Sequence, residues 1–77
     1  MDLLGAIPRA KGETRIAWTE FREKKYLDIR FFARIQDEED LVPTKKGTTI
    51  PESEVVDISV DKDLLTIQLR IRDDSGK

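Results

Sequence analysis

The 77-residue sequence contains no cysteine and no histidine. The missing cysteines exclude disulfide bonds and cysteine-based metal sites, and the missing histidines remove the commonest general base and metal ligand. No apolar run approaches the roughly 18–20 residues that a membrane-spanning helix needs, and the first residues lack the basic opening and long apolar stretch of a secretory signal. We therefore expect one small intracellular domain, in the cytoplasm, nucleoid or nucleus, with no cofactor, no metal and no enzymatic activity.

Charge is distributed unevenly along the chain, although the formal net charge is only −2. The window 9–34 holds eight basic and four acidic residues, which gives +4, whereas the rest of the chain holds six basic and twelve acidic residues, which gives −6. A polyanion responds to the local field of a basic patch rather than to the total charge. The window is therefore a candidate surface for nucleic acid, with a solvated and merely uneven surface as the alternative.

Alternating apolar and polar residues predict two neighbouring strands. Residues 15–21 alternate over a short stretch, and residues 26–35 do so over ten positions rich in aromatic and β-branched side chains. Residues 22–25 connect the two stretches at hairpin length, without a glycine to ease a tight turn. Residues 1–13 show no persistent period and are interrupted by glycine and proline, so we expect them to form a flexible arm.

The middle of the chain reads as an acidic loop followed by a short strand. Asp37 and Glu39 lie in the loop and could hold a hard cation, but no calcium-loop pattern surrounds them, which favours a solvated loop. In the stretch 41–50, Pro43 limits pairing at the start and Gly47 indicates a bend or bulge.

The segment after Pro51 fits two structures. Proline followed by acidic residues is typical of a helix start, and apolar residues from Val56 to Ile71 recur at helical spacing. Residues 56–60 and 65–71 also alternate as strands would, with 61–63 as a turn. We expect a helix from Pro51 to about Asp61, packed between the sheet and a second copy of the chain, and keep a C-terminal β-hairpin as the alternative.

One face of the predicted hairpin interleaves aromatic and cationic side chains. It carries Arg15, Thr19, Phe21, Tyr26, Arg30, Phe32 and Arg34. Single-stranded nucleic acid suits such a face, because each base can stack on an aromatic ring for about 1–3 kcal/mol while cations neutralise the phosphates. The alternative is that the aromatic residues are core. A second candidate is Lys45-Lys46-Gly47, where glycine would let the backbone approach a phosphate, although an ordinary turn has the same sequence.

The order of these segments resembles the transcriptional positive cofactor four family. The resemblance spans about residues 15–56 and is carried by Leu27-Asp28-Ile29-Arg30 and Pro43-Thr44-Lys45-Lys46-Gly47 at matching separation. It implies an α+β fold, in which a curved antiparallel sheet of about four strands is followed by a C-terminal helix that mediates dimerisation. It also implies a single-stranded nucleic-acid-binding domain over residues 14–72, preceded by the arm 1–13 and followed by a tail, 73–77.

The resemblance also implies a set of binding residues. Its aromatic–basic hairpin falls on Phe21, Arg22 and Lys24, its DNA-contacting arginine on Arg30, and its basic pair on Lys45 and Lys46; we add Phe32 and Arg34 from the same face. Four positions depart from the family pattern. Thr19 and Val42 replace basic residues, Glu23 replaces the hairpin glycine, and Ala33 replaces a tryptophan, for which the neighbouring Phe32 is the candidate substitute.

These features lead to one functional expectation and two alternatives. The expectation is a homodimer that binds single-stranded DNA or locally melted duplex with little sequence preference. It would act as a coactivator-like or DNA-transaction accessory protein, with the transcription machinery as a further partner. The alternatives are a protein-interaction module on the same fold and a single-stranded RNA binder, which a DNA-versus-RNA competition would separate.

Overall fold

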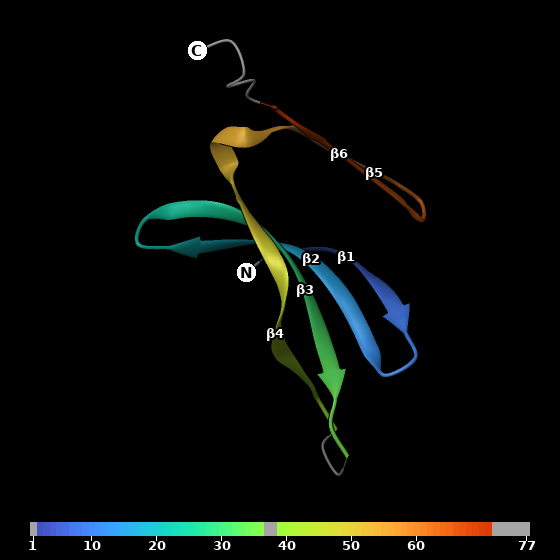
Figure 1. Ribbon diagram of the computed structural model, residues 1–77. Coiled ribbons are helices and arrows are strands. Elements are labelled where there is room, and N and C mark those ends of the chain that lie inside the picture. The colour runs from blue at the N-terminus through green and yellow to red at the C-terminus, as the bar shows by residue number, and fades with distance from the viewer. Residues whose placement is uncertain (1, 37–38, 72–77) are drawn as a thin grey trace.

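A computed structural model describes residues 2–36 and 39–71 of the chain (Figure 1). Within these ranges the chain forms six strands and one short 3₁₀ helix. The elements are β1 (Asp2–Arg9), β2 (Gly12–Phe21), β3 (Lys24–Arg34), β4 (Leu41–Pro51), η1 (Glu52–Glu54), β5 (Val55–Asp61) and β6 (Leu64–Leu69). The predicted tail, 73–77, lies outside the described residues, as does Asp37 of the acidic loop. No helix in the described part is long and apolar enough to cross a membrane.

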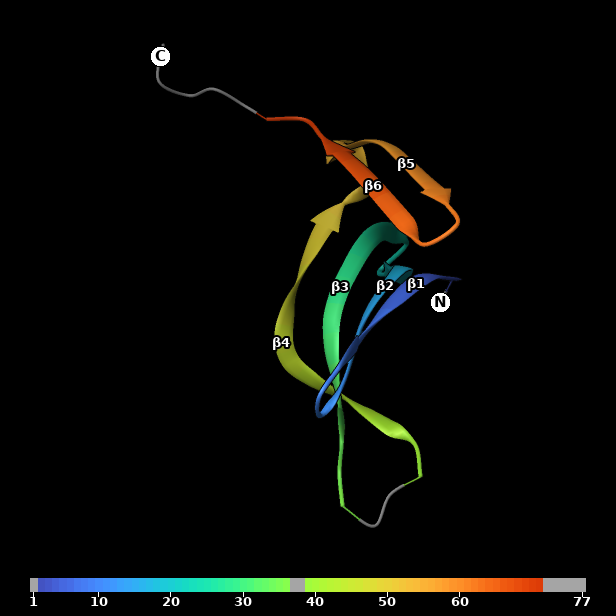
Figure 2. The ribbon, with the colours of Figure 1, turned by 90° about the vertical axis from the view of Figure 1, so that its right-hand side faces the viewer.

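The first four strands form one antiparallel sheet in the order β1-β2-β3-β4, which bends strongly along its length (Figure 2). The predicted curved, four-stranded antiparallel sheet is therefore present. Residues 2–9 lie in this sheet as β1, where a flexible arm was expected. The register of β1 against β2 shifts between Leu3 and Gly5. This irregularity breaks the alternation of apolar residues, which explains why the sequence shows no period there.

The predicted C-terminal helix is wrong, and with it the α+β class. β5 and β6 pair as an antiparallel hairpin, and Pro51 precedes only the three-residue η1. The alternative reading, a C-terminal hairpin, is the one that the structure shows. A hairpin gathers Ile58, Val60, Leu65 and Ile67 on one face, because cross-strand partners share a face. A helix would have spread the apolar residues over two sides, and the β-branched side chains favour the strand.

The β5–β6 hairpin lies across one end of the four-stranded sheet and covers its apolar face incompletely (Figure 2). Only four apolar side chains in the described part are buried: Ile16, Ala17, Leu27 and Phe32. Leu27, the fourth residue of β3, is 0% exposed. A cleft of about 680 Å³ remains between the hairpin and strands β1 to β3, lined mainly by aliphatic side chains such as Ile7 and Ile67. The core is therefore small, and it is covered least completely where the β5–β6 hairpin lies over it.

Candidate nucleic-acid interface

The register between β2 and β3 brings the predicted aromatic and cationic residues onto one face of the sheet. Arg15 lies opposite Arg30, Thr19 opposite Tyr26, and Phe21 opposite Lys24. Directly opposed residues of an antiparallel pair share a face, and every second residue along each strand lies on that same face. We call this the arginine face. Its members on β2 and β3 include Arg15, Thr19, Phe21, Lys24, Tyr26, Arg30, Phe32 and Arg34.

The tip of the β2–β3 hairpin projects from the body of the sheet (Figure 1, teal) and exposes its aromatic residue. Phe21 is 61% exposed, and the guanidinium carbon of Arg22 lies 5.1 Å from the centroid of its ring. Arg22 and Glu23 form the two-residue turn with φ of 53° and 67°. A type I′ turn requires positive φ at both central residues, which costs non-glycine residues about 1–2 kcal/mol each. The tip therefore places one aromatic ring and two cations, Arg22 and Lys24, on a strained and exposed turn.

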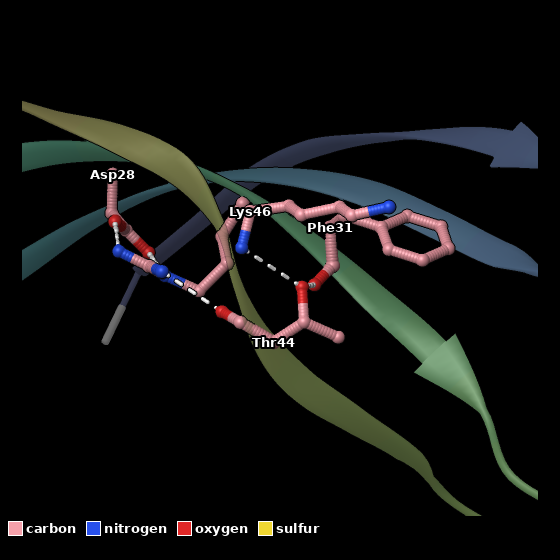
Figure 3. Close-up of polar contacts among 5 residues, drawn as sticks. Asp28, Phe31, Thr44 and Lys46 are labelled. Atoms are coloured by element: carbon pink, nitrogen blue, oxygen red, sulfur yellow. Dashed lines mark hydrogen bonds and ion pairs between the residues drawn. The ribbon is translucent and has the colours of Figure 1, made fainter.

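Arg30 is held by three hydrogen bonds in the middle of the same face (Figure 3). Its Nε and Nη2 donate to the Asp28 carboxylate at 3.3 and 3.0 Å, and its Nη1 donates to the Thr44 carbonyl oxygen at 2.9 Å. A guanidinium has five N–H groups, so two remain for a ligand. Arg30 thus has a fixed position, in which it links β3 to β4 and still presents donors to the surface.

The lysine pair lies on an irregular part of β4. The β3–β4 register shifts between Arg30, opposite Gly47, and Phe32, opposite Pro43. Three residues, 44–46, therefore face the single residue Phe31, and this bulge carries the exposed Lys45 and Lys46. The Thr44 hydroxyl donates to the Phe31 carbonyl oxygen at 2.8 Å and accepts from the Lys46 backbone N–H at 3.2 Å (Figure 3).

Gly47 adjoins the bulge, as the sequence predicted, but its structural reason differs from the predicted approach to a phosphate. A Cβ at this position would lie 2.9 Å from the Arg30 Cα and still closer to the Ile29 carbonyl oxygen. Both are backbone atoms, which cannot move aside as a flexible side chain could. Glycine is therefore needed for β4 to approach β3, and the predicted close approach to a phosphate is not what requires it.

Phe32 is buried in the structure. It is 7% exposed, and the guanidinium carbon of Arg15 lies 4.3 Å from its ring centroid. Arg15 Nε in turn donates to Glu13 Oε2 at 2.7 Å, so the guanidinium is held over the ring. In this arrangement a base cannot stack on Phe32. Phe32 therefore cannot replace the tryptophan that the family pattern has at the position of Ala33. On the two neighbouring strands, Ala33 lies opposite Gly12 and Val42.

Two further members of the arginine face, Arg34 and Tyr26, belong to neither the turn of the tip nor the bulge. Arg34 is exposed at the far end of β3, ten residues and about 33 Å of strand from Lys24. Tyr26 is half-buried and opposes Pro51 of β4. The structure therefore groups the remaining candidates in two sets, which are the tip (Phe21, Arg22 and Lys24) and the bulge with its anchor (Arg30, Lys45 and Lys46).

Three further residues shape the face: sequence reasoning placed Arg15 on it without its contact with Phe32, and it missed Asp28 and Thr44. Two of them belong to a pattern visible in the sequence, an acidic residue two positions before an arginine, at Glu13-x-Arg15 and Asp28-x-Arg30. In a strand this spacing puts the carboxylate and the guanidinium on one face. The two arginines oppose each other directly, an arrangement that like charges normally disfavour, and each is neutralised by its own carboxylate. Within residues 2–36 and 39–71, no cluster of three carboxylates has the geometry of a metal site.

The fold and this surface define a small antiparallel β-sheet protein with an aromatic–basic hairpin and a lysine-bearing bulge. A comparison with known families matches residues 9–59 to the family described as Transcriptional Coactivator p15 (PC4). The match covers more than half of the 77 residues, and the chain belongs to this family. No curated protein and no solved structure was found to match the chain. The family match ends within β5, so β6 lies beyond it.

Proposed function

We propose that the protein binds single-stranded DNA, or locally melted duplex, with little sequence preference, and acts as a coactivator-like or DNA-transaction accessory protein. Membership in a transcriptional coactivator family supports a DNA-binding, non-enzymatic role inside the cell, in the nucleus or nucleoid. The observation that carries the proposal is the hairpin tip, where the exposed Phe21 precedes Arg22 and lies opposite Lys24 at a turn with strained backbone. An aromatic ring flanked by cations suits a base and the phosphates on either side of it.

Each contact has a distinct role. Phe21 stacks on an unpaired base, and Arg22 and Lys24 neutralise the adjacent phosphates. Arg30 donates its two remaining N–H groups to a phosphate, and Asp28 positions it for this. Lys45 and Lys46 hold the strand where it passes the bulge, and Arg34 supplies an outlying charge.

Stacking favours single strands over duplex. In a duplex the faces of the bases are covered by their neighbours, and sequence is read through the groove edges by a helix or a narrow ribbon. Phe21 offers an exposed ring for stacking rather than hydrogen-bonding groups for the groove edges, and every base offers a π-face, so binding is sequence-tolerant. A homodimer would pair two such surfaces and raise the affinity for a longer strand through effective concentration.

The test is a fluorescence-anisotropy titration of a labelled single-stranded oligonucleotide at two salt concentrations, with unlabelled duplex and RNA as competitors. We expect DNA binding that resists duplex, and whose affinity falls with salt at a log–log slope of about −0.7 per phosphate contact. The double substitution Phe21→Ala/Lys46→Ala weakens binding by about tenfold or more, because one stacking platform and one phosphate contact are lost.

The matched control is Val56→Ala/Lys62→Ala, which removes an exposed apolar residue and an exposed lysine from the other hairpin. Its affinity should equal that of the unmodified protein. Unchanged affinity in a folded Phe21→Ala/Lys46→Ala protein would discard the assigned contacts. Stronger competition by RNA would move the proposal to an RNA ligand. No binding even at low salt would favour the alternative, in which a protein partner occupies the same face.

A further inference from the structure

The two sheets of the described structure have four open edges, and three of them carry features that oppose pairing with another strand. β1 has the irregularity at Gly5 and a proline, Pro8. β4 has the bulge with Lys45 and Lys46. β5 has two aspartates and a register shift between Val55 and Asp57. Prolines, charges and bulges are the means by which natural sheets prevent edge-to-edge association.

The fourth edge, β6, has none of these features. Its six residues, Leu64–Leu69, include no charge, no proline and no glycine, and its register against β5 is regular from Leu64 to Gln68. Its other edge pairs with no strand of the described structure. Leu64 and Leu69 at its two ends are 63% and 44% exposed. An exposed apolar edge of this kind is a template for a further strand.

We propose that β6 pairs antiparallel with β6 of a second copy of the chain, so that two hairpins form one four-stranded intermolecular sheet, β5-β6-β6′-β5′. This inference does not depend on the proposed DNA binding. It also gives the homodimer an interface that differs from the expected helix, which does not exist here.

The proposed register is centred on Ile67. A two-fold axis perpendicular to the sheet keeps the apolar faces of both copies on the same side, so opposed residues must share a face. Centring on Ile67 pairs Leu65 with Leu69 of the second copy, and Ile67 with its own equivalent. Centring on Thr66 would instead place Leu69 opposite Asp63 in the turn. The Ile67 register places the three apolar residues of this face, Leu65, Ile67 and Leu69, opposite one another.

A second copy is the occupant that this strand fits best, because β6 is self-complementary. No like charges meet anywhere from Leu64 to Leu69, and the polar positions pair Thr66 with Gln68. Since β-branched and leucine side chains oppose each other in the other pairs, the cross-strand contacts are favourable. The combined sheet also extends the apolar face that each hairpin turns toward its own four-stranded sheet.

The test compares two double variants by sedimentation equilibrium without DNA. Thr66→Lys/Gln68→Lys places ammonium groups opposite each other twice in the proposed register and should raise the dimer dissociation constant by about tenfold or more. Thr66→Glu/Gln68→Lys places opposite charges at the same positions and should dimerise like the unmodified chain. Within one copy, residue 68 opposes Asp57 and residue 66 opposes Ser59, so neither variant places like charges directly opposite each other across its own hairpin.

Two further measurements keep the proposal falsifiable. Ser59→Lys adds a charge to the same hairpin face but on β5, and should leave dimerisation unchanged. In the unmodified chain, the β6 amides that do not pair with β5 should exchange hydrogen slowly at high protein concentration and quickly on dilution. A monomeric chain, equal dissociation constants for the two double variants, or exchange independent of concentration would each overturn the proposal. Monomeric behaviour would leave a strand from another protein as the occupant to seek.

Discussion

The β2–β3 and β5–β6 hairpins are built alike at their turns and differently everywhere else. Each closes through two residues without glycine, and positive φ occurs at Arg22 and Glu23 in one turn and at Lys62 in the other. β2 and β3 are the central strands of the four-stranded sheet, whereas β5 and β6 pair only with each other in the described structure. The first tip is flanked by Phe21 and Lys24, and the second by Asp61 and Leu64.

The two hairpins therefore differ in how well the rest of the sheet stabilises them. The central position of β2 and β3 gives their hairpin ladder hydrogen bonds on both sides and the most buried side chain, Leu27. A strongly held hairpin can tolerate a strained turn, so its tip is free to carry exposed aromatic and basic residues. The β5–β6 hairpin has no such support. Its apolar face rests on an open cleft, and it needs either its own sheet or a partner to remain ordered.

The largest expected effect contrasts an apolar side chain of the four-stranded sheet with one of the β5–β6 hairpin. Leu27→Ala should lower the free energy of unfolding by about 3 kcal/mol, because it opens a cavity under a fully buried side chain. Ile58→Ala on β5 should cost only about 1 kcal/mol, since that side chain is half-exposed. Urea unfolding at one protein concentration, followed by the fluorescence of the single tryptophan, Trp18, measures both. Equal costs would mean that the hairpin is as well packed as the central sheet.

The second prediction contrasts the two strained turns. Glu23→Gly should raise the free energy of unfolding by about 1–2 kcal/mol, because glycine adopts positive φ without steric cost. It should also tighten binding to single-stranded DNA, since it removes a negative charge between Arg22 and Lys24. Lys62→Gly should give a similar gain in stability with no change in DNA affinity. If both variants change affinity alike, the tip of β2–β3 has no special role in binding.

The contrast between the hairpins also marks how far the sequence can be read. The β2–β3 hairpin was predictable because residues 26–35 alternate without interruption, and the same alternation gave the membership of the arginine face. The family resemblance was likewise confirmed. The C-terminal hairpin was the harder case. Its apolar residues satisfy periods of 3.6 and 2.0 together, and only the pairing of Ile58 with Ile67 decides between them.

The fate of individual site residues depends on contacts that alternation does not encode. Period two places Phe21 and Phe32 on the same face, but it cannot show that Arg15 covers Phe32 while Phe21 extends beyond the sheet. The Arg30 bond to the Thr44 carbonyl oxygen similarly requires the β3–β4 register, which a bulge alters. The strand β1 was missed for a related reason, because its irregularity at Gly5 removes the period.

The smallest expected effect concerns one lysine near the turn of each hairpin, Lys24 and Lys62. Lys24→Gln should remove one phosphate contact and make the log–log salt slope of single-stranded DNA binding shallower by about 0.7. At 0.1 M salt, a decrease of 0.7 in this slope corresponds to DNA binding that is about fivefold weaker. Lys62→Gln removes the same charge from an equally exposed turn, but Asp61 and Asp63 flank it, so slope and affinity should stay unchanged. Anisotropy titrations at four salt concentrations resolve the two slopes. Since both variants change the net charge equally, a shared shift would mean that DNA responds to the charge of the whole chain, and a shift confined to Lys24→Gln would locate the contact at the β2–β3 tip.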